Sequence, residues 1–189
     1  MGEYAGEQFT FLPSQVIAWG DFKNRFPDGD VLARPSASRP YGANPYVGYD
    51  SSADPFLFRG EPDPRLHAVE RVAGLTTENT AKAYPFALLA ERGVVEDAFD
   101  GRAIALFHNA GATSALDARQ IRDGKDVGAV AIFDRTLDGQ LLSFSADGKG
   151  TFTDAGTQST WNILGEAISG LLAGTRLTEL VHFDHFWFA

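Results

Sequence analysis

Three side chains near the end of the chain are of the types that bind metal ions. His182, Asp184 and His185 form a His-x-Asp-His cluster, and imidazole with carboxylate is the ligand set of zinc and non-haem iron. In a strand, however, His182 and Asp184 share one face while His185 points to the other, so only two of them can converge without a bend. The cluster could hold a divalent metal ion, but the favoured interpretation is that His185 hydrogen-bonds within an aromatic core and His182 is exposed.

A second group of reactive side chains follows the apolar run at residues 103–107. His108, Ser114 and Asp117 could supply a base, a nucleophile and an orienting carboxylate, and catalytic groups often lie on such loops. Three residues of one short loop rarely reach the mutual geometry of a catalytic triad, so a turn that the side chains of Asn109, Ser114 and Asp117 stabilise through hydrogen bonds to the backbone is favoured. The sequence contains no phosphate-binding loop, dinucleotide fingerprint, Gly-x-Ser-x-Gly or His-Glu-x-x-His motif. The sequence therefore does not identify a reaction.

Aromatic and cationic side chains gather in the first third of the chain. They are Arg39, Tyr41, Tyr46, Tyr49 and Arg59. Stacking faces beside cations suit a sugar or another planar ligand, whereas the competing interpretation is that these tyrosines only anchor an irregular segment. With Arg39 and the tyrosines, His108 and Trp161 complete our set of candidate ligand-binding residues.

The elements that must position these candidates are mostly strands. Four Asp-Gly pairs, at residues 100–101, 123–124, 138–139 and 147–148, are typical of tight hairpin turns. The β-prone runs are residues 69–75, 80–84, 103–107, 128–134, 140–145 and 151–154. This spacing predicts an antiparallel β meander.

Helical signals are short and few. Apolar residues spaced by three and four predict an amphipathic helix over residues 13–26, and Pro85 with Gly93 brackets another. Residues 162–172 could form a third, which Gly165 and Gly170 weaken, and residues 31–33 could form a strand. Residues 34–64 are rich in Pro, Gly and Tyr, which indicates a long ordered loop. We therefore expect one α+β domain over residues 1–189, with a helix and irregular loop at 1–64 and a β-rich body at 65–189.

Composition excludes several classes of function. The 189 residues include 16 basic and 25 acidic side chains, for a net charge of −9, which argues against nucleic acid or anionic membrane surfaces as partners. The chain has no cysteine, so it contains no disulfide, thiolate zinc ligand or catalytic thiol. Residues 1–10 lack the features of a signal peptide, and no apolar run approaches the roughly 20 residues that span a bilayer.

The chain ends on aromatic side chains. Phe183, Phe186, Trp187 and Phe188 lie within the last seven residues, and leaving each of them in water would cost about 1.5–3 kcal/mol relative to burial. We expect this tail to pack against the body and the chain to be a fragment of a longer protein.

Ordered motifs along the chain carry a family resemblance. They include Arg39-x-Tyr-Gly-x-Asn-Pro-Tyr-x-x-Tyr49, Glu70-Arg-Val72, Ala81-Lys-Ala-Tyr-Pro85, Gly111-x-x-Ser-Ala-Leu-Asp117, Asp126-Val-Gly128, Ser159-Thr-Trp161 and Gly165-x-Ala-x-x-Gly170. In this order they resemble the family known as domain of unknown function 3179. Longer members carry an upstream half with a Cys-Pro-Leu-Cys motif, which implies thiol redox chemistry or metal binding there. This chain has His108-Asn-Ala-Gly111 where that motif would fall by analogy, so no catalytic residue is carried over. Many members look exported or lipid-anchored, which implies an extracytoplasmic location.

The sequence favours a non-redox accessory module of the cell envelope that binds a small ligand or a partner. The partner would be the missing upstream half of the parent protein or another envelope protein. One alternative is a metal-dependent enzyme that uses His108, His182, Asp184 and His185. Another is a purely structural repeat half, which a faint similarity between residues 11–19 and 177–187 suggests.

Overall fold

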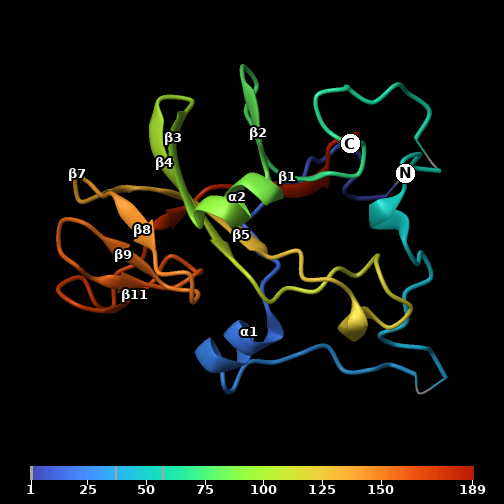
Figure 1. Cartoon of the computed structure of the whole chain (residues 1–189), viewed down its shortest axis with the longest axis horizontal. Coiled ribbons are helices and arrows are strands. Elements are labelled where there is room, and N and C mark those ends of the chain that lie inside the picture. The colour runs from blue at the N-terminus through green and yellow to red at the C-terminus, as the bar shows by residue number, and fades with distance from the viewer. Residues whose placement is uncertain (1, 37, 57) are drawn as a thin grey trace.

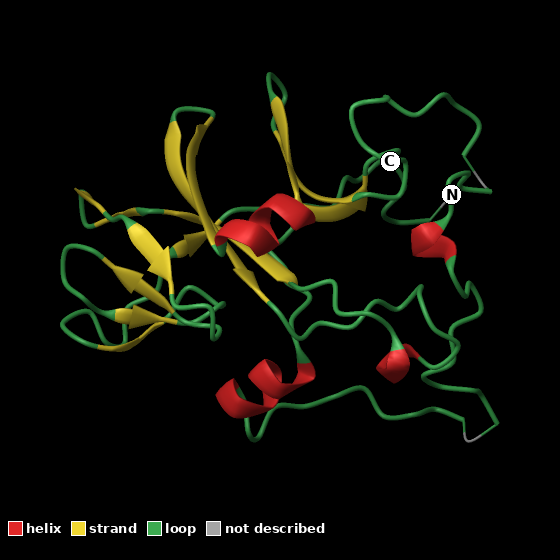
Figure 2. Ribbon diagram, viewed as in Figure 1, coloured by secondary structure: helices red, strands yellow, loops and turns green. Residues whose placement is uncertain are grey.

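The fold consists mainly of antiparallel strands in several sheets, with short helices around them (Figures 1 and 2). The computed structural model describes residues 2–36, 38–56 and 58–189. The helices are α1 (Trp19–Arg25), η1 (Tyr49–Ser51), α2 (Phe86–Arg92) and η2 (Ile121–Asp123). The strands are β1 (Arg71–Thr76), β2 (Ala81–Pro85), β3 (Val94–Phe99), β4 (Arg102–Asn109), β5 (Ala129–Asp134), β6 (Thr136–Leu137), β7 (Gln140–Leu141), β8 (Phe144–Ala146), β9 (Phe152–Asp154), β10 (Thr160–Trp161), β11 (Ala167–Ser169), β12 (Thr178–Glu179) and β13 (Phe183–Phe186). The predicted β-rich α+β class is confirmed. Within the described residues, no helix has the length and apolar character needed to cross a membrane.

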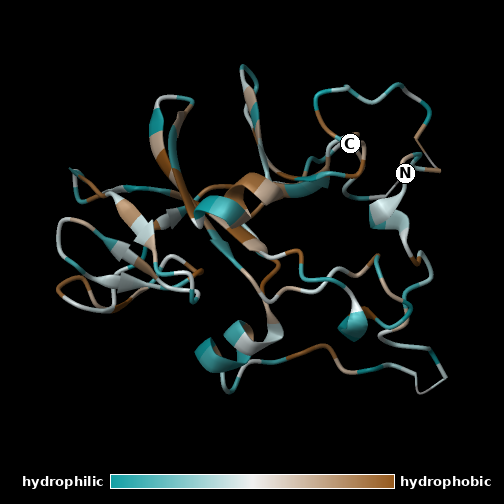
Figure 3. Cartoon of the chain, in the orientation of Figure 1, coloured by the Kyte–Doolittle hydropathy of each residue, from teal (hydrophilic) through white to brown (hydrophobic). Residues whose placement is uncertain are grey.

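The central sheet, in the order β12-β5-β4-β3, is buried on both faces. Its two middle strands are almost continuously apolar, Ala-Ile-Ala-Leu-Phe in β4 and Ala-Val-Ala-Ile-Phe in β5. Successive side chains of a strand point to opposite faces, so each strand supplies residues to two separate cores. Hydrophobic residues gather where α2 meets this sheet (Figure 3).

The first core lies between the central sheet and the sheet β11-β10-β9-β8. Phe107 and Phe133 come from the central sheet and meet Phe152 and Trp161. The rings of Phe107 and Phe152 stack with centroids 4.1 Å apart, which adds to the free energy of burial.

The second core lies on the opposite face of the central sheet, under α2 and the sheet β13-β1-β2. Ile104 and Leu106 of β4 pack here with Phe86 and Leu89 of α2. Helix α2 begins directly after Pro85 and ends before Gly93, so the predicted helix is confirmed. The predicted hairpin of residues 69–75 and 80–84 is also confirmed, as β1 and β2.

The long loop of residues 34–64 is irregular in its described part, apart from η1, as predicted. It lies along residues 116–121 through backbone hydrogen bonds. Asn44 N donates to Arg119 O at 2.9 Å and Gly48 N donates to Asp117 O at 2.8 Å. These contacts place η1 beside the connection between β4 and β5.

The aromatic tail packs against the end of that loop, as predicted. Trp187 Nε1 donates to the carbonyl of Asp63 at 2.8 Å, and the rings of Phe58 and Phe188 lie 5.1 Å apart. The tail is half-buried and continues from β13, which pairs with β1.

Two predicted helices need correction. The helix expected at 13–26 begins only at Trp19, because residue 18 is extended, with φ −60° and ψ 139°. The helix expected at 162–172 is absent from the described chain; turns and strand β11 occupy its place. Gly165 reverses the chain there with φ +71°, and a Cβ on it would lie 2.5 Å from the ring of Phe133. Packing against the first core thus selects a turn over a helix.

Several strand predictions also change. Residues 31–33 form no strand, and the run at 140–145 divides into β7 and β8. Strand β3 was not predicted. Two Asp-Gly pairs, at 100–101 and 138–139, have positive φ at both residues and close hairpins, as predicted. The pair at 123–124 instead ends η2.

Candidate functional site

A cavity of about 480 Å³ lies where β4 ends and β5 begins. Five segments build its walls: η1, the start of β1, one side of α2, the end of β4 and the residues that lead into β5. Pockets of this size hold small organic ligands in other proteins. We treat this cavity as the candidate site.

His108 projects into the cavity from the end of β4. In the alternation of that strand it shares a face with Ile104 and Leu106, so it lies on the α2 side of the sheet. Its ring lies against Gly128, where a Cβ would come within 2.1 Å of Nε2. Glycine is therefore required at this position, which also has φ +75°.

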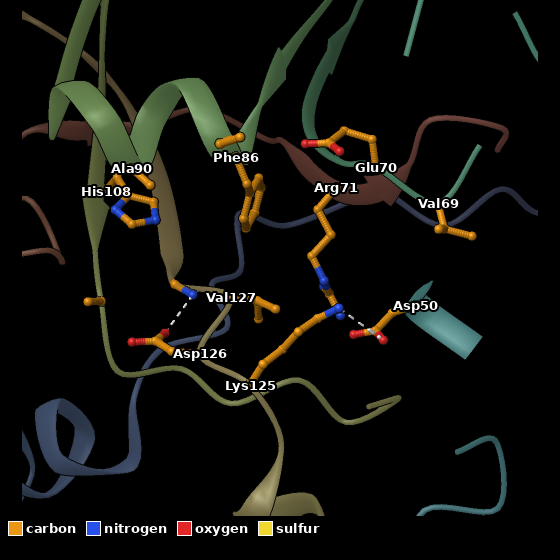
Figure 4. Close-up of a pocket in the computed structure, with 13 residues that line it drawn as sticks. Asp50, Val69, Glu70, Arg71, Phe86, Ala90, His108, Lys125, Asp126 and Val127 are labelled. Atoms are coloured by element: carbon orange, nitrogen blue, oxygen red, sulfur yellow. Dashed lines mark hydrogen bonds and ion pairs between the residues drawn. The ribbon is translucent and has the colours of Figure 1, made fainter. Parts of the chain in front are cut away.

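His108 is half-buried, and this burial changes its acidity. Burial lowers the pKa of His108 below its usual value of 6.5, and the nearby Asp126 carboxylate raises the pKa by a smaller amount. Figure 4 shows the ring beside Ala90 of α2, and no other residue drawn there is hydrogen-bonded to it. The imidazole is thus neutral at neutral pH and can both donate and accept a hydrogen bond.

Asp126 forms the polar wall below His108 (Figure 4). Its Oδ2 accepts from Gly111 N at 2.7 Å and its Oδ1 accepts from Gly128 N at 2.9 Å. These two backbone contacts fix the carboxylate and the entrance to β5 together.

The opposite corner of the cavity is an ion pair between Asp50 of the long loop and Lys125 of the connection between β4 and β5. Asp50 is 7% exposed and lies 3.3 Å from Lys125 Nζ. Ser114 Oγ also donates to Asp50 at 2.5 Å. The docked loop therefore completes this wall.

Arg71 enters the same cavity from β1 and is also paired. Its Nη1 donates to Asp184 Oδ2 on the neighbouring strand β13 at 2.8 Å. Burial raises the pKa of Asp184, and the positive charge of Arg71 opposes that shift. Asp184 itself lines a smaller cavity of about 190 Å³, which shares Phe86 and Gly128 with the first.

The structure does not bring His182, Asp184 and His185 together as a metal site. Both ring nitrogens of His182 face backbone carbonyls, Leu180 O at 2.9 Å and Val130 O at 3.3 Å, so these carbonyls occupy the positions that a metal ion would need. Within residues 2–36, 38–56 and 58–189, no group of three or more His, Asp or Glu could hold a metal ion. The expected burial is also reversed, since His182 is buried and His185 is exposed against Phe183.

The aromatic candidates of the long loop lie outside the main cavity's wall. Arg39 is exposed, and Tyr41 stacks under the guanidinium of Arg34. Tyr46 and Tyr49 contact Phe56, and Tyr49 also contacts Phe186 of the tail. Tyr49 thus anchors the loop and places its neighbour Asp50 in the cavity.

Trp161 is fully buried in the first core, so it presents no surface to a ligand. Its Nε1 donates to the buried carboxylate of Asp154 at 3.1 Å. The same carboxylate accepts from Thr157 and Ser159. The Ser159–Trp161 motif therefore has a structural explanation.

Ser114 and Asp117 do not form a triad with His108. Ser114 Oγ is bonded to Asp50 and accepts from Leu116 N, while Asp117 Oδ2 accepts from Lys125 N at 2.7 Å. The side-chain-stabilised turn favoured from the sequence is confirmed for Ser114 and Asp117, whereas the Asn109 side chain donates to Asp21 Oδ2 at 3.0 Å.

The comparison with protein families agrees with the motifs. The model described as "Protein of unknown function (DUF3179)" matches residues 1–189. The chain belongs to the DUF3179 family. No curated protein and no solved structure gives a significant match.

Several cavity residues of this DUF3179 chain were not singled out from the sequence. They are Asp50, Glu70, Arg71, Lys125 and Asp126. Glu70, Arg71 and Asp126 belong to two of the family-like motifs, and this membership was the feature of the sequence that could have identified them. Asp50 and Lys125 are joined only by the docking of the long loop, which no local pattern indicates.

Proposed function

We propose that this DUF3179 chain is a non-redox module that binds a small molecule in the cavity at His108. The observation that carries the proposal is the half-buried His108 at the wall of a cavity of about 480 Å³. A mostly apolar cavity with a few polar groups is the usual form of a ligand site. Phe86 and Val127 supply apolar wall here, and His108 supplies a polar group.

The non-redox part of the proposal rests on composition. The chain has no cysteine, so thiol chemistry would have to come from residues outside this chain. The imidazole of His108 stands at the place where the family resemblance suggests the redox motif.

A ligand screen against a cavity-filled variant tests this function. Ala90 is exposed on α2 and lines the cavity, so Ala90→Phe should fill it without removing a core contact. We expect some compounds of a broad small-molecule library to raise the melting temperature of the wild type and to lose this effect in Ala90→Phe.

Ala98→Phe is the matched control, because Ala98 is exposed on β3 and does not line this cavity. Compounds that bind the cavity should stabilise Ala98→Phe as they stabilise the wild type. A screen without hits, or hits that Ala90→Phe leaves unchanged, would contradict the proposal.

The proposal includes an extracytoplasmic location and a partner, either the upstream half of longer relatives or another envelope protein. Apolar side chains of the first third support a partner, since Phe9 is 94% and Leu32 is 100% exposed. Fractionation of cells that make the native protein tests the location, and cross-linking in the same cells tests the partner.

A further inference from the structure

The cavity at His108 is lined by charges of both signs, and both cations are already paired. Arg71 donates to Asp184 at 2.8 Å, and Lys125 Nζ lies 3.3 Å from Asp50. An anionic ligand would have to compete with Asp184 at Arg71 Nη1 and with Asp50 at Lys125 Nζ, although Arg71 Nε is buried and has no hydrogen-bond partner. These two ion pairs close one end of the cavity and leave it no free positive charge among the described residues.

Two carboxylates of the cavity have no cationic partner in the described chain. Glu70 is half-buried at the start of β1, and Figure 4 draws no contact to its carboxylate. Asp126 receives hydrogen bonds from two backbone N–H groups but no ion pair. Because His108 is neutral at neutral pH, the charge that remains in the cavity is negative.

Apolar surface lies between these carboxylates. The side chains of Phe86 and Val127 line the cavity between Glu70 on one side and Asp126 on the other (Figure 4). An ammonium group near the half-buried Glu70 would be attracted more strongly there than in water, because apolar walls lower the local dielectric constant, whereas the exposed Asp126 adds a weaker attraction. The attached hydrocarbon would cover the apolar wall.

We infer that the cavity selects a small organic cation, an amine with an apolar body. This inference rests on the proposed binding function and adds the chemical class of the ligand. Neutral compounds of the same shape would gain the apolar contacts alone, and carboxylates would be repelled.

Three probes of one shape separate these cases. They are 2-phenylethylamine, 2-phenylethanol and 3-phenylpropionate, each titrated into the full chain while the backbone amide signals of Ala90, Ala110 and Gly128 are followed by NMR. We expect the amine to bind at least about tenfold more tightly than the alcohol, which corresponds to one strong charge interaction. Added salt should weaken the binding of the amine and leave the binding of the alcohol unchanged.

Glu70→Gln removes the negative charge of Glu70 and keeps the size of its side chain, so it tests the contribution of that charge. We expect it to lower the affinity for the amine about three- to tenfold and to leave the alcohol unchanged. Glu78→Gln is the matched control, because Glu78 is exposed in the turn between β1 and β2. Melting curves establish that both variants are folded.

The outcomes separate this inference from the function on which it rests. If the alcohol or the propionate binds the cavity as tightly as the amine, the binding function stands and the charge selection is overturned. If Glu70→Gln and Glu78→Gln bind the amine equally and Asp126→Asn does as well, the selection is likewise overturned. If no probe binds and the library screen gives no cavity-dependent hit, the binding function itself is wrong.

Discussion

His108 is the residue on which the candidate site depends, and its acidity can be measured. Because burial lowers the pKa of His108 and Asp126 raises it by less, we predict that the side chain titrates below 6.5. Asp126→Asn removes the negative charge that raises the pKa of His108, so it should lower this pKa further. NMR titration of the histidine ring signals measures both values. A pKa above 6.5, or a rise in Asp126→Asn, would contradict the assignment.

The same shift has a consequence for stability. A histidine with a depressed pKa in the folded state binds its proton more tightly when the chain unfolds, so the free energy of unfolding increases with pH until about 6.5. His108→Gln should remove this part of the pH dependence. Urea unfolding at several pH values between about 5 and 7 measures it, with the wild type as reference.

Among single residues, the sequence singled out His108 as a candidate but not the residues that surround it in the cavity. His108 follows an apolar run, and a polar residue after a buried strand is a local signal. Asp50 meets Ser114 across 64 residues of chain, and Lys125 joins the same contact from a third position. Only the folded loop brings these groups together, so their roles could not be derived from spacing.

Among the elements, local signals predicted those that begin and end with strong turn or cap residues. Helix α2 lies between Pro85 and Gly93, and the predicted turn at Asp100-Gly101 closes a hairpin, although the first strand of that hairpin, β3, was not predicted. Tertiary packing decided the others. The helix expected at 162–172 gives way to a turn at Gly165 because Phe133 packs where a Cβ would stand.

The turn between β9 and β10 is predicted to depend on one buried carboxylate. Asp154 is fully buried and accepts hydrogen bonds from Thr157, Ser159 and Trp161. Asp154→Ala should lower the free energy of unfolding by about 3 kcal/mol, because the donors are left without an acceptor. Urea unfolding at neutral pH measures the loss. Asp147→Ala is the control, since Asp147 holds an exposed turn through similar contacts, and we expect it to change stability less.

The pH dependence of Asp154 gives an independent check. Burial alone would raise the pKa of Asp154, but hydrogen bonds from Thr157, Trp161 and Ser159 outweigh burial and lower it. A depressed carboxyl pKa stabilises the folded state above the ordinary value of 3.8 and loses this effect as pH falls through the folded value. The difference between wild type and Asp154→Ala should therefore shrink below about pH 4. A difference that stays constant from pH 7 to pH 3 would contradict this role.

In the whole molecule, the central sheet joins two cores that share no side chain. Leu106 belongs to the core under α2 and Phe107 belongs to the core beneath the sheet β11-β10-β9-β8. They are consecutive in β4, so neither core can lose its strand while the other keeps it. This arrangement supports the prediction from the sequence that the chain forms one domain.

We therefore predict that both cores unfold in a single transition. Leu106→Ala and Phe107→Ala should each lower the free energy of unfolding by about 2–5 kcal/mol. Trp161 reports the first core, and replacing Trp19 and Trp187 by Phe makes it the sole indole; far-UV circular dichroism reports all the strands. Each substitution should shift the urea midpoint of both signals equally, although only Phe107 belongs to the core of Trp161. If Leu106→Ala moved the circular dichroism transition and left the Trp161 transition in place, the two cores would unfold separately and the single-domain prediction would be wrong.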